Sequence, residues 1–339
     1  MKTLFFAFCC LAGTAVLWVH RGSAEAVNGL ISEQIASHFE QVFSPSSSDR
    51  TQDRDNWLPG NDAESKLFDM EISLSGSATQ VARTSIKNSD HDADVWFSET
   101  AYNFSYPFKP GKKIGFIAKI SDYYIDETTE GGELVFAYDH ASQIDLGVMY
   151  TTNLNPRWDL FCGTGVTISD GNGPLQNSST NYLIFLGASF TINPDLTISF
   201  GGIASTNPTL DSGSFPQFML EWRINDLSRL SIRDGIYYQY ALTSDWRNIL
   251  GFSVECFCLS VEEEKQWLNG KLRDRPTRIL EDYSLNLTYS HRFGTGLMLD
   301  TKLGLGHLGH HGLWEGDHEF TKTDLNYSVG LSLGLSYRF

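Results

Sequence analysis

The end of the chain alternates strictly between two kinds of side chain. The residues between the apolar ones are Ser, Gly or Arg, and the apolar or aromatic set is Tyr327, Val329, Leu331, Leu333, Leu335, Tyr337 and Phe339. A period of two over this length predicts a β-strand whose two faces meet different surroundings. An apolar face with tyrosines near both ends suits lipid and its interfaces, and a small polar face suits a barrel lumen. Strands of soluble sandwiches average about five or six residues, and this one is about twice as long.

Similar alternation recurs from residue 67 onward and predicts fifteen short segments. They cover 67–80, 95–106, 114–124, 132–139, 143–152, 157–169, 181–191, 195–205, 216–223, 227–233, 235–243, 246–261, 280–293, 295–307 and 325–339. A single-chain bacterial barrel has an even number of strands, so we join 132–152 into one strand. The sequence therefore predicts an all-β fold, a single transmembrane antiparallel up-and-down β-barrel over 67–339. We expect fourteen strands, with twelve as the alternative.

The connections between these segments alternate in length. Tight turns are expected at 107–112, 154–156, 193–195, 243–245 and 293–295, and longer loops at 170–180, 206–215, 262–279 and 308–324. Outer-membrane barrels have short periplasmic turns and long external loops. The pattern therefore orients the predicted barrel, with the C-terminal residue on the periplasmic side.

The N-terminus has the parts of a cleavable secretory signal. Lys2 precedes an apolar stretch, and Ala24 and Ala26 are the small residues of a cleavage site, so we expect 1–26 to be removed. Residues 27–66 form a different segment, a periplasmic leader with a possible short amphipathic helix over 30–43 and a polar linker after it. A plug for the barrel and a partly ordered leader both fit this segment.

Charge and cysteine content exclude several classes of protein. Without residues 1–26 the chain has 23 basic and 40 acidic side chains, a net charge of −17, so nucleic acid is not an expected partner. Three cysteines would remain, namely Cys162, Cys256 and Cys258. An odd number in an exported chain argues against a disulfide scaffold.

The last five residues, Leu335-Ser336-Tyr337-Arg338-Phe339, resemble the C-terminal signal of bacterial outer-membrane β-barrels. The resemblance implies the outer membrane of a Gram-negative cell, contact with its lipid, and recognition of Leu335, Tyr337 and Phe339 by the barrel-assembly machinery. In addition, 215–223, 238–242 and Trp246 are similar to a family of predicted outer-membrane barrels of unknown function. That resemblance implies a fold and no activity.

Two polar groups are candidate metal or catalytic sites. One is rich in histidine and includes His307, His310, His311 and His318; the other includes Asp90 and Asp92 beside His91. Imidazole and carboxylate groups can hold zinc or copper, yet the spacing fits no established metal motif, and a solvated external loop explains the same residues. Acidic groups beside a histidine could also activate water at the rim of a barrel. We predict no cofactor.

Basic residues on the predicted inward faces are candidates for lining a pore. They are Lys119, Arg223, Arg229, Arg233, Lys302 and Arg338. The first functional hypothesis is therefore a channel or passive uptake porin for small solutes, with the excess of acid favouring cations. The alternatives are an outer-membrane hydrolase that uses the external-loop His and Asp residues, and a structural or adhesive barrel with a closed lumen.

Overall fold

The structure is a computed structural model. It describes residues 71–86, 91–128, 140–170, 179–206, 214–233, 235–262, 266–268, 271–273, 277–294, 296–315 and 318–338. The expected signal peptide 1–26, the leader 27–66 with its helix 30–43, and the expected strand 132–139 lie outside these residues. Within the described ranges, no helix is long and apolar enough to cross a membrane.

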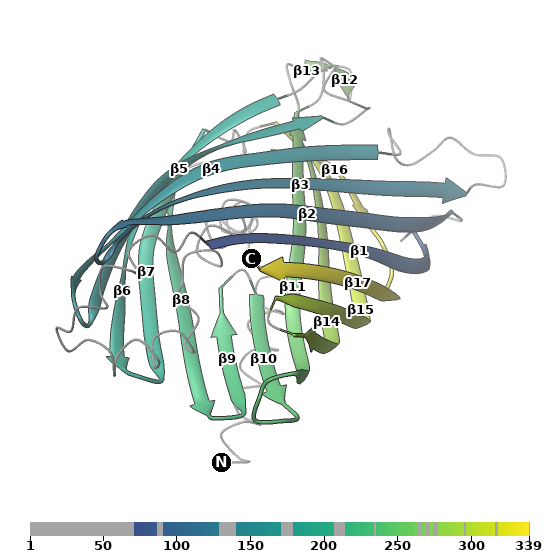
Figure 1. Cartoon of the computed structure of the whole chain (residues 1–339). Helices are drawn as coiled ribbons and strands as arrows, with labels where there is room; N and C mark the ends of the chain where they lie inside the picture. The colour runs from purple at the N-terminus through teal and green to yellow at the C-terminus, as the bar shows by residue number, and fades with distance from the viewer. Residues whose placement is uncertain are drawn as a thin grey trace.

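Fourteen antiparallel strands form a closed β-barrel (Figure 1). They are β1 (Glu71–Ser85), β2 (Asp92–Lys109), β3 (Lys112–Thr128), β4 (His140–Asn155), β5 (Trp158–Asp170), β6 (Ser179–Asn193), β7 (Leu196–Ser205), β8 (Ser214–Asn225), β9 (Ser228–Ile232), β10 (Gly235–Ala241), β11 (Asn248–Glu262), β14 (Thr277–Phe293), β15 (Leu297–Glu315) and β17 (Ser328–Arg338). This confirms the expected fold class and the count of fourteen.

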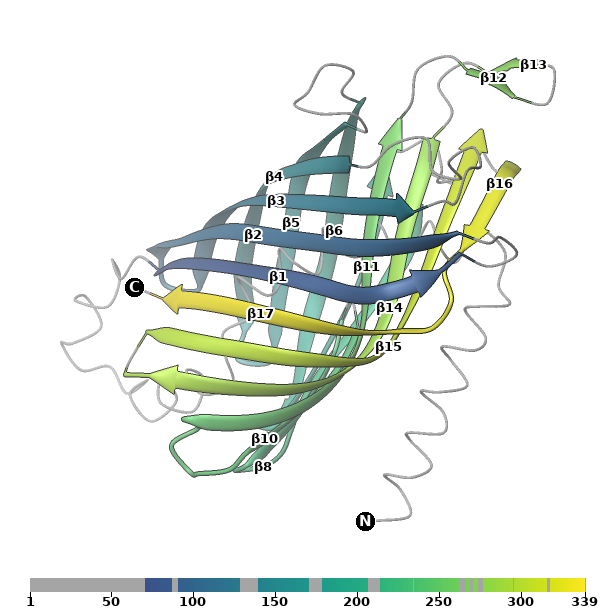
Figure 2. The ribbon, with the colours of Figure 1, turned by 90° about the vertical axis from the view of Figure 1, so that its right-hand side faces the viewer.

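The first and last strands close the barrel. β1 pairs with β17 in a continuous register from Ser73↔Arg338 to Val81↔Gly330. Figure 2 shows these two strands side by side, with β15 on the other side of β17. Closure leaves the wall no edge at this seam, which a sheet surrounded by lipid requires.

The sequence prediction of a last long loop is wrong. Residues 308–324 were expected to form an external loop, but β15 continues to Glu315 and pairs with β16 (His318–Asp324) as a hairpin. The alternation of apolar and polar residues weakens after Leu305, so the periodic signal ended before the strand did. A second small hairpin, β12 (Gln266–Leu268) with β13 (Lys271–Arg273), lies within the expected loop 262–279.

Local chemistry explains the tight turns. Gly111 and Gly294 have φ values of 68° and 62°, which glycine adopts without steric cost. The Asn155 side chain accepts hydrogen bonds from the N–H groups of Arg157 and Trp158 at 2.9 and 3.1 Å. Such Asx contacts replace backbone pairing where the chain reverses.

The interior of the barrel narrows between opposite walls. Cα atoms of β11 lie within 8 Å of Cα atoms of β4 and of β5, although neither β4 nor β5 is a neighbour of β11 in the sheet. Face-to-face sheets usually pack about 10 Å apart, so the two walls touch. The barrel is therefore flattened at this level rather than evenly round.

Candidate functional site

Exposure assigns the two faces of the barrel wall. On β6, Tyr182, Ile184 and Leu186 are 59–64% exposed, whereas Leu183 and Phe185 are 3% and 2% exposed. The same alternation on β17 exposes Leu331, Leu333 and Leu335 and buries Ser332. The outer face is thus apolar, and the inner face is where charged side chains of the strands gather.

One group of charged side chains lies on the inner face of β2, β3 and β4. Lys119 Nζ is 2.7 Å from Glu99 Oε2, and Asp145 stands directly opposite Lys119 in the register. Asp145 is 3% exposed. Its carboxylate accepts hydrogen bonds from Gln143 Nε2 at 2.9 and 3.0 Å and from the Thr167 hydroxyl at 2.7 Å. A buried carboxylate needs such partners, and the inner wall supplies them.

A second group lies on β11, β14 and β15. Lys302 Nζ donates to both oxygens of the Glu255 carboxylate, at 2.8 and 2.9 Å. The Ser253 hydroxyl also donates to Glu255, at 2.7 Å, and Asp300 pairs with the Ser290 hydroxyl. Lys302 lies within electrostatic range of Glu99 as well. The two groups therefore form one inner charged belt, made of Glu99, Lys119, Asp145, Glu255, Asp300 and Lys302.

Two apolar clusters flank this belt on the inner face. Along β3, Ile117 belongs to one cluster, Lys119 to the belt, and Tyr123 to the other cluster. The first, which we call the β3–β8 cluster, consists of Ile117, Met149, Phe161, Leu183, Phe185, Ile203 and Met219. The second, near the long-loop end, includes Val81, Val95, Tyr123, Ile125 and Leu325. The belt is thus a polar zone between two apolar ones.

Sequence reasoning found the two lysines of the belt and missed its acids. Lys119 and Lys302 lie on the inner face. That they line a pore stays a prediction. The predicted pore-lining set contains basic residues only and therefore lacks Glu99, Asp145 and Glu255. They occupy inward positions of strands that the alternation predicts, so the same alternation would have placed these acids on the inner face.

The four predicted arginines lie at the tight-turn end of the barrel or on the short strands. Arg223 pairs with Asp195 at 2.6 Å, and the Arg229 guanidinium lies 4.1 Å from the centre of the Trp246 ring. Arg233 Nε donates to the Ser231 hydroxyl at 2.8 Å. Arg338 is the exposed last residue of β17. All four arginines thus lie outside the inner charged belt, and Arg223 and Arg229 hold residues of the adjacent tight turns.

The histidine and aspartate candidates are not brought together by the described residues. The backbones of His307, His310 and His311 lie in β15 and that of His318 in β16, a strand hairpin instead of the expected loop; their side chains, like all of Asp90, lie outside the described part. Asp92 accepts from Arg83 Nε at 3.1 Å. No group of three or more metal-ligating side chains occurs among the residues described.

A serine, a histidine and an aspartate meet on the outer face near the long-loop end. The His140 Nε2 atom is 3.0 Å from the Ser142 hydroxyl and 3.4 Å from Asp122 Oδ1, and the Ser142 hydroxyl donates to Asp122 at 2.7 Å. In a catalytic triad the carboxylate contacts the other ring nitrogen, opposite the serine. Here serine and carboxylate share Nε2, so the group is not arranged for nucleophilic catalysis. The Tyr124 ring stacks on His140 at 4.2 Å.

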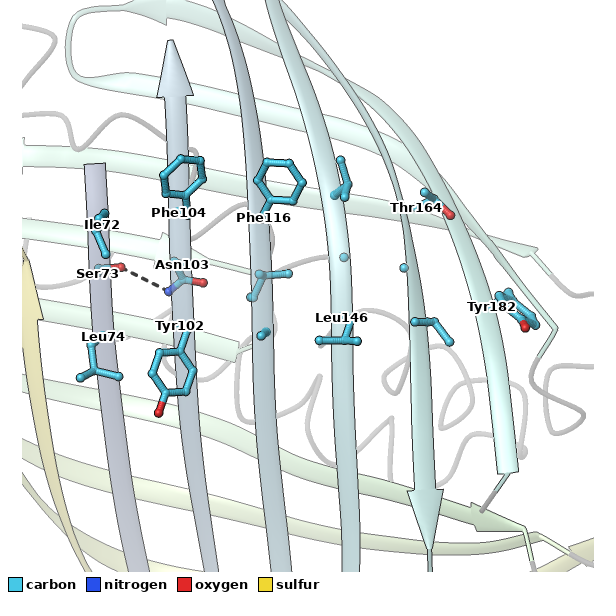
Figure 3. A pocket seen from close by; sticks show the side chains of 16 residues that line it. Ile72, Ser73, Leu74, Tyr102, Asn103, Phe104, Phe116, Leu146, Thr164 and Tyr182 are labelled. Carbon is cyan, nitrogen blue, oxygen red and sulfur yellow. Dashed lines mark hydrogen bonds between the residues drawn. The ribbon is translucent and has the colours of Figure 1, made fainter. Parts of the chain in front are cut away.

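The outer face of β1–β6 is hollowed. The hollow has a volume of about 790 Å³, and Tyr102, Phe104, Phe116, Leu146 and Tyr182 are among the side chains around it (Figure 3). Its floor is nearly all apolar, with a hydrogen bond of 3.3 Å from the Asn103 amide to the Ser73 hydroxyl. It lies on the strands that include β4 and β5, whose inner faces approach β11.

Several solved structures are similar to the chain at low identity. An outer-membrane channel from Pseudomonas putida F1 is 11% identical, with a TM-score of 0.43, covering 79% of this chain and 95% of that one. A FadL homologue from Pseudomonas aeruginosa is 8% identical, with a TM-score of 0.38, covering 80% and 89%. OprB from Pseudomonas putida, at low pH, is 10% identical, with a TM-score of 0.35, covering 84% and 98%.

These similarities do not decide the function, and with TM-scores below 0.5 the fold rests on the strand pairing itself. No family model matches the chain, and no curated protein is similar to it in sequence. The similarity of 215–223, 238–242 and Trp246 to a family of predicted barrels stays a prediction.

Proposed function

We propose that the protein is an outer-membrane channel that lets small solutes diffuse through its barrel. The observation that carries this proposal is the inner charged belt. Charged side chains are costly to hold in a closed apolar core, whereas rings of charge line the passages of channels. The belt lies between two apolar clusters, where a core without a passage would have no use for six charges.

The size of the barrel supports small solutes. Eight strands already fill with side chains, so fourteen strands leave room for a passage. The approach of β11 to β4 and β5 narrows this interior. We therefore infer a narrow passage rather than a wide pore.

The charges of the belt favour cations. Its four carboxylates, on Glu99, Asp145, Glu255 and Asp300, outnumber the ammonium groups of Lys119 and Lys302. An acidic constriction attracts counter-ions and repels anions, and it does so more strongly in a narrow, low-dielectric setting. The whole chain, with a formal net charge of −16, adds to this field.

The outer face supports placement in the outer membrane. Leu, Ile, Val, Phe and Tyr side chains cover it, and aromatic residues such as Trp96, Tyr124 and Phe104 stand toward the two ends of their strands. Lipid would contact this face, and the barrel-assembly machinery would insert the chain by way of Phe339, Tyr337 and Leu335.

Conductance of the purified protein in a planar lipid bilayer tests the proposal. We expect stepwise current and, in a KCl gradient, a reversal potential that indicates cation preference. Glu255→Gln should weaken that preference, while Glu221→Gln, an acid outside the belt, serves as the matched control. Absence of stepwise current from correctly folded protein would overturn the proposed channel function and leave a structural barrel.

A further inference from the structure

Two neighbouring strands are too short to span the barrel wall. β9 has 5 residues and β10 has 7, whereas β8 and β11 on either side have 12 and 15. A membrane-spanning strand needs about 9–11 residues. The β9–β10 hairpin starts at the tight-turn end and closes where the Arg233 N–H bonds the Gly235 carbonyl at 2.9 Å, and Figure 1 shows β8 and β11 continuing beyond it.

Within the described part of the chain, the strands beside the hairpin therefore keep edges without a paired strand. β8 pairs with β9 only from Leu220 onward, so among the described residues Ser214 to Met219 pair on the β7 side alone. β11 pairs with β10 only as far as Glu255, so Cys256 to Glu262 pair on the β14 side alone as far as the described ranges extend. Unsatisfied backbone groups that face hydrocarbon are costly, so such edges are tolerated where they border a passage.

Strand geometry sets the backbone dimensions of this interruption of the wall. Its height, from Met219 to Ser214, is about 17 Å at the usual rise per strand residue. Its width is three strand spacings, about 14 Å between the β8 and β11 backbones. It lies in the half of the barrel that carries the longer connections, which faces outward from the cell in the proposed orientation.

Two apolar side chains stand at the β8 edge of the interruption, beside the buried amide of Gln217. Phe218 on the outer face is 56% exposed, and Met219 on the inner face belongs to the β3–β8 cluster. That cluster runs from β8 around the inner wall to β3, so an apolar inner surface begins at the edge of the interruption. The Arg233 guanidinium, held 5.8 Å from the Tyr237 ring, stands at its base.

We propose that this interruption is a lateral exit, through which small apolar or weakly amphipathic solutes pass between the barrel interior and the surrounding lipid. The proposal rests on the proposed channel function and assigns its solute class. A polar solute leaving sideways would lose its hydration in hydrocarbon, whereas an apolar one gains from the transfer. The inner charged belt then limits the axial route, and the β3–β8 cluster borders the lateral one.

A reversible cross-link across the interruption tests the exit. Cys162 and Cys258 are replaced by Ser, and Phe218→Cys is paired with the natural Cys256, which lies at the same level of β11. A bifunctional maleimide with a cleavable disulfide joins them. The matched control joins Phe218→Cys to Phe200→Cys, which stand opposite each other on the paired strands β7 and β8, with Cys256 also replaced by Ser.

Entry of the apolar dye N-phenyl-1-naphthylamine into porin-depleted Gram-negative cells is the readout, with KCl conductance measured in parallel. We expect the cross-link to lower dye entry to the level of cells without the protein, and reduction to restore it, while conductance and the control are unchanged. A second variant, in which four alternating residues lengthen the β9–β10 hairpin, should have the same effect.

Other outcomes separate the two proposals. Conductance with no dye entry by the unmodified protein, or dye entry that survives both modifications, overturns the lateral exit and leaves the channel. A cross-linked species of twice the mass would show a second copy seated in the interruption, which also overturns the exit. Absence of both conductance and dye entry overturns the channel itself.

Discussion

The ring of Phe185 on β6 lies over Gly163 on β5 so closely that a Cβ on Gly163 would come within 2.2 Å of Phe185 Cζ. Phe161 and Gly187 have the reciprocal relationship, also at 2.2 Å. Two large rings on the inner face therefore fill the space above two glycines. This reciprocal packing of rings over glycines stabilises the β3–β8 cluster. Glycine inside a strand marks such close approach.

Gly163→Ala should destabilise the barrel. The added Cβ would also lie 2.6 Å from the Val148 carbonyl oxygen, which is backbone and cannot swing away. Overpacking of this kind costs about 1–3 kcal/mol. Gly334→Ala on β17 is the control, because its Cβ would meet nothing closer than 3.5 Å. Urea unfolding in lipid vesicles, followed by Trp fluorescence, measures both, and equal stabilities would contradict the packing described here.

Lys119→Met should weaken the barrel and increase its preference for cations. The substitution removes the partner of Glu99 and leaves two carboxylates without their nearest cation. Since the Lys119 and Glu99 side chains are 10% and 28% exposed, we expect a loss of about 2 kcal/mol or more in unfolding free energy.

Arg83→Met is the control for this pair. The ion pair of Arg83 with Asp92 is 54% and 44% exposed, and its loss should cost no more than about 1 kcal/mol. Reversal potentials in a KCl gradient report the change in selectivity. If Lys119→Met left both stability and selectivity unchanged, the belt would have neither a structural nor an electrostatic role.

Alternation in the sequence predicted the barrel, and the rule that such barrels have an even number of strands corrected fifteen segments to fourteen. The orientation drawn from the loop lengths stays a prediction. The regular strands were found because their apolar face must contact lipid at every second residue. The pattern did not predict the hairpin of β15 and β16. Residues beyond the lipid-facing zone do not need an apolar side chain at every second position. The belt pairs, such as Lys302 with Glu255, join strands separated by β14, and a period along one strand contains no information on partners across the sheet.

Acidification should protonate Asp245 later than an ordinary aspartate. In the turn between β10 and β11, the hydrogen bond from the Thr243 hydroxyl, followed by that from the Arg247 N–H, lowers the pKa of Asp245 below 3.8. Because the pKa of Asp245 is lower in the folded than in the unfolded chain, ionised Asp245 stabilises the folded state. This stabilisation is complete above pH 3.8 and is lost as the pH falls through the pKa of the folded state. Thr243→Val should raise the pKa and Thr243→Ser should preserve it. Carboxyl ¹³C NMR titration measures this, and identical titrations of the two variants would refute the cause.

Phe339→Ala should slow insertion that depends on the barrel-assembly machinery while leaving spontaneous folding in detergent unchanged. The reason is that recognition of a terminal aromatic is a binding step separate from strand pairing. Phe293→Ala is the control, because Phe293 is an exposed aromatic residue at the end of β14. β14 and β17 end on the same side of the barrel. Heat-modifiable mobility on gels follows both reactions. Equal insertion rates for the two variants would argue that the C-terminal residue is not a recognition signal.

Trp246→Gly should be more stable than Trp246→Ala, although it removes more of the side chain. Trp246 has a φ of 53°, a left-handed conformation that a residue with a Cβ adopts at a cost. Both variants lose the stacking of Arg229 on the indole and the hydrogen bond of 3.0 Å from its N–H to the Asp226 carbonyl, so these losses cancel in the comparison. The glycine then gains about 1 kcal/mol from relief of backbone strain. Urea unfolding would contradict this account if the alanine variant were the more stable, because the turn would then tolerate a Cβ without strain.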